Sequence, residues 1–247
     1  MRSNKNSKNR EIWIYGKHAV KAALQNKNRK IFRFVVLESV LESLHLDLSK
    51  NLKPEIVNSE FFQAKFGKNA THQGCAVMTE PLPDIFLEDL LEDEFDMRPF
   101  VFLDQITDPQ NVGSIMRASA VFGARAVVVT ENCSPELTPA IIKAASGAAE
   151  LIPFIRVTNL VQSMNKLKKE GFWCIGLDER GTKQLQHIDL KSNIVIVIGS
   201  EGDGLRRLTR ESCDFLVQLP FFDKFSTLNA AQAATVSLYE ILRQQKS

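Results

Sequence analysis

Three polar, glycine- or asparagine-bearing loops in the second half of the chain hold the residues best suited to chemistry. The loops span residues 104–113, 199–204 and 219–229, and each follows a hydrophobic run. If each run is a strand of a parallel sheet, the loops lie at its carboxyl edge, where open α/β sheets bind ligands. The sequence therefore predicts a ligand site built from these three loops.

The middle loop has the glycine spacing G-x-x-G-x-G, formed by Gly199, Gly202 and Gly204. This is not the dinucleotide fingerprint G-x-G-x-x-G, and a tight structural turn explains the glycines equally well. Glu201 favours a functional role, because a carboxylate at a strand end can accept hydrogen bonds from a substrate or orient a cation.

In the first loop, Asp108, Pro109 and Asn111 are typical of a turn that caps a helix beginning near Gly113. Arg117 lies on the first turns of that helix among small apolar residues, so its guanidinium is expected near the same strand edge. A cation there suits a phosphate or a developing oxyanion. Taken alone, an ordinary surface arginine is an equally good interpretation.

The third loop places Ser226, Thr227 and Asn229 just before a helix expected over residues 230–244. An N-cap accounts for one of these polar residues and not for all three. The helix is rich in alanine on successive turns, which permits close packing of another element, including one across a dimer interface.

The 247 residues, with 44% hydrophobic and 24% charged side chains, can form one large or two modest globular domains. The apolar runs are too short to cross a bilayer. The basic residues at the start of the sequence are not followed by the apolar stretch of a signal peptide, so we expect a cytoplasmic protein. The cysteines and histidines lack disulfide or metal-ligand spacing. Cys174, within a hydrophobic run, is interpreted as a small buried residue and not as a catalytic thiol.

The net charge of +2 hides strong segregation along the chain. Residues 2–33 are rich in lysine and arginine with Glu11 as the only acid, which indicates a polyanion-binding surface. Residues 84–96 carry seven acids and no basic residue, which is typical of a solvated linker. Pro81, Pro83 and Pro99 border this stretch, so a domain boundary is expected between residues 80 and 99.

Hydrophobic periodicity predicts a small α/β unit before this boundary and a strand–helix alternation after it. The first unit is expected to contain helices at 17–25, 40–49 and 59–65 and strands at 31–37, near Ile56 and at 74–79. The second is expected to contain strands at 100–103, 126–129, 152–157, 172–177, 194–198 and 215–219, with helices at 113–122, 139–145, 160–169 and 230–244. Continuous β-branched runs such as 194–198 favour a mainly parallel sheet covered by helices on both faces.

The pattern Asn-x-Gly-x-x-x-Arg formed by Asn111, Gly113 and Arg117 opens a series of three ordered stretches, 104–117, 196–207 and 219–230. Together they resemble the motifs of the SpoU-type (TrmH-like) RNA ribose 2′-O-methyltransferases of the SPOUT superfamily. The amino-terminal unit, with residues 15–20 and 72–74, is similar to the L30e-like substrate-binding domain of the family's 23S rRNA guanosine methyltransferase branch.

This resemblance implies a basic disordered tail at 1–10, an L30e-like domain at 11–80, an acidic linker at 81–98 and a SPOUT domain at 99–247. It also implies a deep carboxyl-terminal trefoil knot, bound S-adenosylmethionine, and a homodimer whose active site uses both subunits. No pattern argument gives the knot, because knots are nearly absent among folds.

The implied cofactor contacts, largely through backbone groups, are Gly199, Leu219 and Leu228. The implied catalytic or RNA-positioning residues are Asn111, Arg117, Glu201, Thr227 and Asn229.

Two positions depart from the family pattern. Thr227 stands where serine is common and keeps the hydroxyl, whereas Ala231 stands where serine is frequent and loses it.

The implied reaction is in-line methyl transfer to a ribose 2′-hydroxyl, which DNA lacks. Because arginine resists deprotonation, Arg117 is expected to position the substrate and stabilise oxyanion character, with base action left open. Ribosomal RNA is the favoured partner and transfer RNA the alternative. Two other interpretations are a catalytically silent RNA-binding or ribosome-assembly protein and an NAD- or ATP-dependent enzyme, although no suitable phosphate loop is present.

Overall fold

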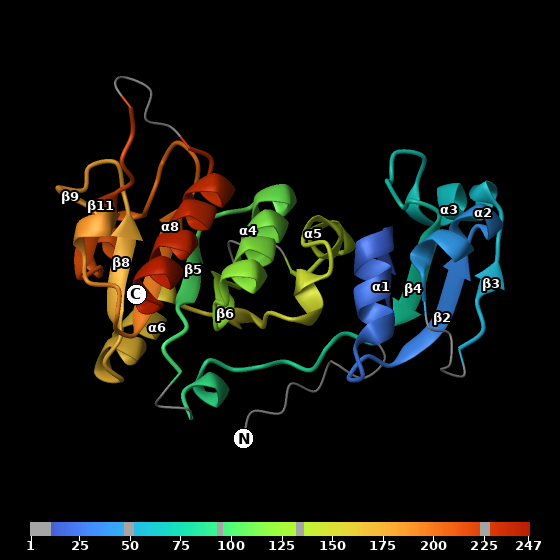
Figure 1. Ribbon diagram of the computed structural model, residues 1–247, viewed down its shortest axis with the longest axis horizontal. Coiled ribbons are helices and arrows are strands. Elements are labelled where there is room, and N and C mark those ends of the chain that lie inside the picture. Colours follow the sequence, from blue (N-terminus) through green and yellow to red (C-terminus); the bar gives the residue numbers. More distant parts are fainter. Residues whose placement is uncertain (1–10, 47–51, 93–95, 132–135, 223–227) are drawn as a thin grey trace.

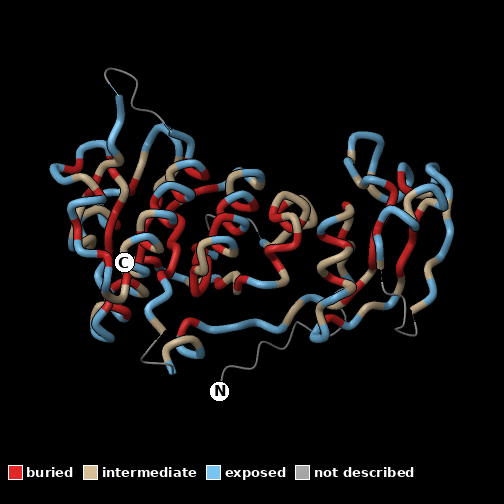
Figure 2. Tube along the Cα trace, in the orientation of Figure 1, coloured by how far each residue is buried: buried red, intermediate tan, exposed pale blue. Residues whose placement is uncertain are grey.

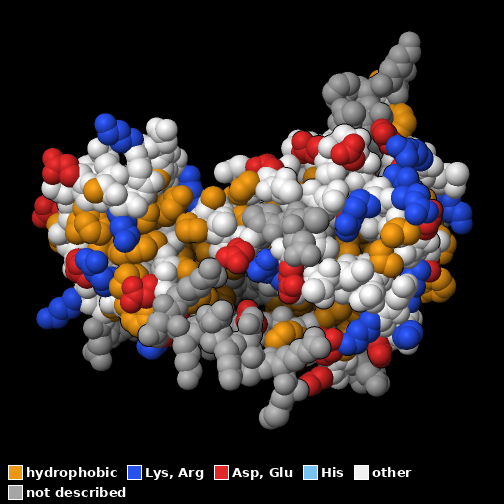
Figure 3. Space-filling model, turned by 180° about the vertical axis from the view of Figure 1, so that it is seen from behind, with side chains coloured by type: hydrophobic (Ala, Val, Ile, Leu, Met, Phe, Trp, Pro, Cys, Tyr) orange, Lys and Arg blue, Asp and Glu red, His pale blue; other side chains and the backbone are white. Residues whose placement is uncertain are grey.

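The computed structural model describes residues 11–46, 52–92, 96–131, 136–222 and 228–247. Within these residues the chain forms two α/β units that lie side by side, with an extended connection along one edge (Figure 1). In the space-filling view from behind, a notch separates the upper parts of the two units (Figure 3). The expected domain bounds at 11–80 and 99–247 stay predictions.

The amino-terminal unit has a four-stranded sheet in the order β1-β4-β2-β3, in which β4 is antiparallel to β1 and β2, and β3 is parallel to β2. Its elements are β1 (Ile12–Tyr15), α1 (Lys17–Gln25), β2 (Ile31–Val36), α2 (Glu38–Leu41), η1 (Glu42–Leu44), β3 (Glu55–Ile56), α3 (Ser59–Phe66) and β4 (Cys75–Thr79).

The helix expected at 40–49 is wrong in its extent. Helical structure runs from α2 into the 3₁₀ turn η1 and ends at Leu44, because His45 adopts a left-handed φ of 44°. Strand β1 was not predicted at all.

The two amino-terminal motifs form one structural unit. The side-chain Oε1 of Gln73 accepts a hydrogen bond from the Lys17 amide at 2.9 Å, which satisfies an amide at the start of α1. Gly74 has a φ of 74°, and a Cβ there would lie 2.8 Å from the side chain of Val40 and 2.9 Å from that of Leu37. The residue types at 72–74 therefore have a packing reason in addition to any role in binding.

The carboxyl-terminal unit has a seven-stranded sheet in which all paired strands are parallel, in the order β7-β6-β5-β10-β8-β11-β9. The connection and this unit contain η2 (Glu88–Leu90), β5 (Phe100–Asp104), α4 (Pro109–Phe122), β6 (Ala126–Thr130), α5 (Pro139–Ala144), η3 (Ala148–Glu150), β7 (Phe154–Val157), α6 (Leu160–Lys169), β8 (Trp173–Leu177), β9 (Lys183–Gln184), η4 (Leu185–His187), β10 (Ile194–Gly199), α7 (Arg207–Glu211), β11 (Phe215–Gln218) and α8 (Ala230–Gln245). The expected parallel sheet is confirmed.

Helices cover both faces of this sheet, and the central strands are buried throughout (Figure 2). On β5, Val101 and Leu103 belong to the same hydrophobic cluster as α4 and α8, whereas Phe100 and Phe102 belong to the cluster that contains α6. This alternation explains why residues 100–103 of β5 are all hydrophobic and do not alternate with polar residues.

The strand order reverses between β5 and β10. From β5 the chain moves outward through β6 and β7, and it then returns to the other side of β5 with β10, β8 and β11. The register places Gly199 beside Asp104, so loops that are far apart in the sequence leave the sheet side by side. Such a reversal at the carboxyl edge is the position where open α/β sheets bind ligands.

The two units meet through a buried polar contact. The Arg29 and Glu150 side chains are only 1% and 3% exposed and form an ion pair of 2.8 Å. Asn26 also donates to Glu150 at 2.7 Å, and Arg29 donates to the carbonyl of Glu80 at 2.8 Å. Because every partner is fixed by hydrogen bonds, this contact holds α1 at one position against η3.

No helix in the described parts of the chain is long and apolar enough to cross a membrane. The trefoil knot implied by the family resemblance stays a prediction.

Candidate active site

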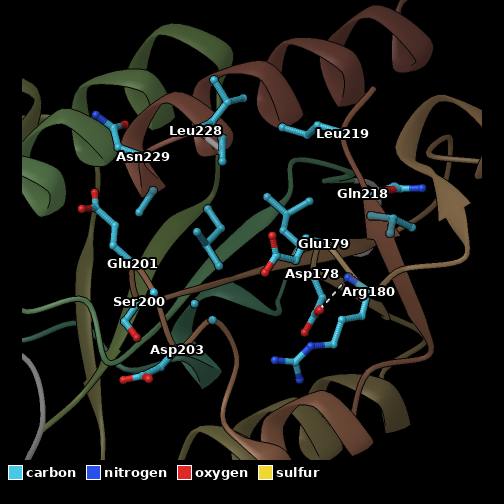
Figure 4. A pocket seen from close by; sticks show the side chains of 18 of the residues that line it. Asp178, Glu179, Arg180, Ser200, Glu201, Asp203, Gln218, Leu219, Leu228 and Asn229 are labelled. Carbon is cyan, nitrogen blue, oxygen red and sulfur yellow. Dashed lines mark hydrogen bonds between the residues drawn. The ribbon is translucent and has the colours of Figure 1, made fainter. Parts of the chain in front are cut away.

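A cavity of about 460 Å³ opens at the carboxyl edge of the large sheet (Figure 4). Its volume lies within the range of about 300–1,000 Å³ that is common for small-molecule sites. The ends of β8, β10 and β11 and the start of α8 enclose it. Among its lining residues are Gly199, Leu219 and Leu228, the three positions at which cofactor contacts were expected.

The glycines of the middle loop have a structural reason. A Cβ on Gly199 would lie 2.2 Å from the carbonyl carbon of Gly204, so the loop closes tightly on itself. Gly202 and Gly204 have φ values of 87° and 67°, which L side chains rarely adopt. The turn interpretation is therefore correct for the glycines, and the same turn places Glu201 on the wall of the cavity.

Asn111 and Glu201 connect two of the three loops. The Asn111 side-chain amide donates to a Glu201 carboxylate oxygen at 2.8 Å. Asn111 lies in the first turn of α4 and not in a loop, because Pro109 occupies the first helical position and the Asp108 carboxylate caps the Asn111 amide at 3.2 Å. The expected helix start at Gly113 is therefore four residues too late.

Gly113 is a packing residue of α4. A Cβ at this position would lie 2.4 Å from the Cβ of Ala144 and 2.8 Å from the backbone nitrogen of Ala145. The glycine of the Asn-x-Gly-x-x-x-Arg pattern thus lets α5 approach α4 closely.

Asn229 joins Glu201 at one end of the cavity (Figure 4). The side-chain Oδ1 of Asn229 accepts from the Gln232 backbone amide at 2.8 Å, and the Asn229 backbone amide donates to Gln232 Oε1 at 3.3 Å, which forms a capping box at the start of α8. Ser226 and Thr227 lie outside the described residues. Ala231 is buried in α8, and its carbonyl accepts the hydroxyl of Thr235 at 2.7 Å.

Arg117 lies apart from this cavity. It is exposed on α4, six positions after Asn111, and lines a second cavity between α4 and α1. Its guanidinium makes no hydrogen bond or ion pair with any residue that the structure describes. The structure therefore brings Asn111, Glu201 and Asn229 to the expected cofactor residues but does not place Arg117 there.

The loop after β8 supplies charged lining residues that were not expected. Asp178, Glu179 and Arg180 lie at the other end of the cavity from Glu201 (Figure 4). The Asp178 carboxylate accepts from the Arg180 amide at 2.9 Å and from Arg210 Nε at 2.7 Å. Like the predicted loops, this one is polar and follows a buried strand, which is the signal that could have identified it.

A second ion pair supports the floor of the site. Asp104, fully buried at the end of β5, accepts from Arg206 Nε at 2.7 Å and from the Arg206 amide at 2.9 Å. The carboxylate thereby fixes the segment that follows the glycine loop.

Comparison with known families decides the assignment of this architecture. Residues 98–239 match the SpoU rRNA Methylase family, and residues 13–84 match the domain described as RNA 2′-O ribose methyltransferase substrate binding. The chain belongs to the SpoU rRNA methylase family. Relatives named 23S rRNA (guanosine-2′-O-)-methyltransferase RlmB from Pseudomonas putida and Coxiella burnetii are each 37% identical, and the matches cover 94% and 95% of this chain and 96% of each relative.

Solved structures show the same SpoU fold. The methyltransferase AviRb from Streptomyces viridochromogenes in complex with AdoMet has a TM-score of 0.80 at 22% identity, covering 100% of this chain and 95% of AviRb. An AdoMet-bound rRNA methyltransferase from Sinorhizobium meliloti has a TM-score of 0.76 at 21% identity, covering 96% of this chain and 89% of that protein. The expected family, fold class and enzyme class are confirmed, and S-adenosylmethionine is the cofactor of this class.

Proposed function

We propose that this protein transfers a methyl group from S-adenosylmethionine to the 2′-hydroxyl of a guanosine in 23S rRNA. The observation that carries the proposal is the similarity of the whole chain, including the substrate-binding unit, to relatives named for this reaction. Since ribosomal RNA is the proposed substrate, we also propose a cytoplasmic location.

The cavity at the sheet edge fits the cofactor by size and by chemistry. Leu219, Leu228 and Ile198 offer apolar surface to an adenine ring, while the backbone of the glycine loop offers amides and carbonyls. The charged groups at its far end, such as Arg180, suit the amino-acid portion of the molecule. When bound, the sulfonium supplies an activated methyl group whose departure leaves a neutral thioether.

The residues of this chain contribute alignment and charge stabilisation. The Asn111 amide holds the Glu201 carboxylate at 2.8 Å, which fixes the orientation of the loop that faces the cofactor cavity. The Arg117 guanidinium binds a substrate phosphate and stabilises negative charge on the reacting oxygen. Asn229, beside Glu201, adds an amide that can orient the ribose.

A homodimer reconciles the separate positions of Arg117 and the cofactor cavity. Exposed apolar side chains on α8, namely Val236 and Tyr239, supply an apolar surface for a second copy of the chain. In the dimer, Arg117 of one copy completes the cavity of the other.

Methyl transfer from labelled S-adenosylmethionine to separate rRNA and tRNA pools from cells lacking the protein tests the proposal. Label on a guanosine ribose of 23S rRNA supports it, and label only in the tRNA pool assigns the alternative substrate. Tight cofactor binding with transfer to neither pool, including precursor rRNA, contradicts the proposed activity.

A further inference from the structure

The second cavity, which we call the interdomain cleft, has a volume of about 650 Å³ and is built by both units. The end of α1 forms one wall, α4 forms the other, and residues 145–151 form the floor. In Figure 1, α5 stands between α1 and α4, directly before this floor segment. The cleft therefore exists only when the amino-terminal unit is docked as observed.

The free charges of the cleft are positive. Lys27 and Arg117 are both exposed in its lining, and neither forms a hydrogen bond or ion pair with the described residues. Among the described residues that line the cleft, the only carboxylate is that of Glu150, which is neutralised by Arg29 and also accepts from Asn26. Two unpartnered cations around one space indicate an anionic ligand.

The lining of the cleft includes small residues. Ala22 and Ala120 on the walls and Gly147 on the floor leave room for a planar or sugar-sized group, and a Cβ at Gly147 would lie 2.8 Å from the Cβ of Ala22. Ser146 adopts a φ of 50°, a left-handed conformation that is costly for serine and is often retained at binding sites. Gln25 adds an exposed amide at the rim.

We infer that the interdomain cleft binds the single-stranded RNA segment next to the target nucleotide, with Lys27 and Arg117 on its backbone phosphates. This inference rests on the proposed function, because the RNA segment in the cleft belongs to the same RNA strand as the reactive ribose. A cleft of this volume admits a nucleotide or two and excludes a duplex. The buried Arg29–Glu150 pair holds Lys27 at a set position relative to Arg117, so docking of the amino-terminal unit positions the RNA.

The Lys27→Ala variant of the full-length protein tests this assignment with a transcribed 23S rRNA fragment as substrate. We expect KM for RNA to rise about tenfold with kcat nearly unchanged, because a phosphate contact contributes to binding and not to the chemical step. The slope of log affinity against log salt should fall by about one, as for the loss of one phosphate contact. Lys169→Ala, an exposed lysine on α6, is the matched control and should change neither quantity.

An unchanged KM and an unchanged salt slope in Lys27→Ala overturn the inference. Binding of guanosine monophosphate that is lost in Lys27→Ala while RNA affinity is retained also overturns it, in favour of a small-nucleotide site. If the wild-type protein methylates no RNA, the proposed function fails by itself. In that case equilibrium RNA binding by wild type, Lys27→Ala and Lys169→Ala still decides whether the cleft holds RNA.

Discussion

Arg117 and Glu201 show how differently two members of one expected site can be placed. Glu201 lies in the cofactor cavity and is fixed by Asn111, whereas Arg117 is exposed in the interdomain cleft. A side chain that makes no ion pair with the described residues contributes little to stability, so we expect Arg117 to act in ligand binding. This separation predicts that cofactor binding and RNA chemistry can be impaired independently.

Arg117→Ala is expected to lower kcat by about 10²–10³-fold while the Kd for S-adenosylmethionine stays within about twofold of wild type. The reason is that the guanidinium lies outside the cofactor cavity of its own chain, and we propose that it acts on the substrate. Single-turnover methylation and calorimetric titration of the cofactor measure the two effects. Equal loss of cofactor affinity and of rate would show that Arg117 supports the cofactor cavity instead.

Two buried thiols and one half-buried thiol make the free energy of unfolding depend on pH in the alkaline range. Burial raises the pKa of Cys75, Cys174 and Cys213 from 9.0 to about 12. Between these values the unfolded chain loses thiol protons that the folded chain keeps, so the free energy of unfolding falls as pH rises from about 9 toward about 12. Each thiol contributes at most about 1.4 kcal/mol per pH unit.

Urea unfolding at about pH 8 and about pH 10.5 measures this fall. Cys75→Ala should show a smaller loss between the two pH values, because one titrating thiol is gone. An identical loss in wild type and in this variant contradicts the assignment to the buried thiols.

At the scale of elements, the close contact between α4 and α5 depends on Gly113. In Gly113→Ala, the new Cβ would lie 2.4 Å from the Ala144 Cβ, so α5 must shift. Alanine gains about 1 kcal/mol of helix propensity, but overpacking against backbone costs about 1–3 kcal/mol, so we expect net destabilisation. Urea unfolding measures it, with the exposed neighbour Ser114→Ala as control. A Gly113→Ala protein more stable than wild type would rule out this packing role.

Periodicity and turn chemistry were enough to predict the parallel sheet and the three loops of the site, since both depend on local patterns. Helix ends were less predictable: α4 begins earlier because Pro109 and the Asp108 cap act together, and the helix from residue 38 stops at Leu44. The Asp178 loop was missed because the position of β8 beside β10 depends on strand order. Arg117 was expected near the strand edge because the helix start was predicted at Gly113. Since α4 begins at Pro109, Arg117 lies eight residues further along the helix, about 12 Å from its start.

At the scale of the whole molecule, the buried Arg29–Glu150 pair and the extended connection fix the position of the two units relative to each other. Asp96 contacts Arg125 Nε at 3.1 Å, and Arg125 also donates to the carbonyl of Leu90 at 2.9 Å, so the connection is attached to the large sheet. The interdomain cleft and the cofactor cavity then have fixed positions within one chain, so a dimer would hold the cleft of one copy at a fixed position relative to the cavity of the other.

Subunit complementation tests whether two copies of the chain share each active site. Arg117→Ala and Glu201→Ala should each be inactive alone, because every site in either homodimer lacks one group. After subunit exchange, half of the dimers are mixed, and in each of these one site combines an intact Glu201 with an intact Arg117 from the other copy. Mixing should therefore restore about a quarter of wild-type activity by C₂ symmetry. Native mass spectrometry of the two variants, one of them carrying a mass tag, measures the fraction of mixed dimers and so controls for exchange. If exchange is complete and no activity returns, both groups act within one subunit and the dimeric site is wrong.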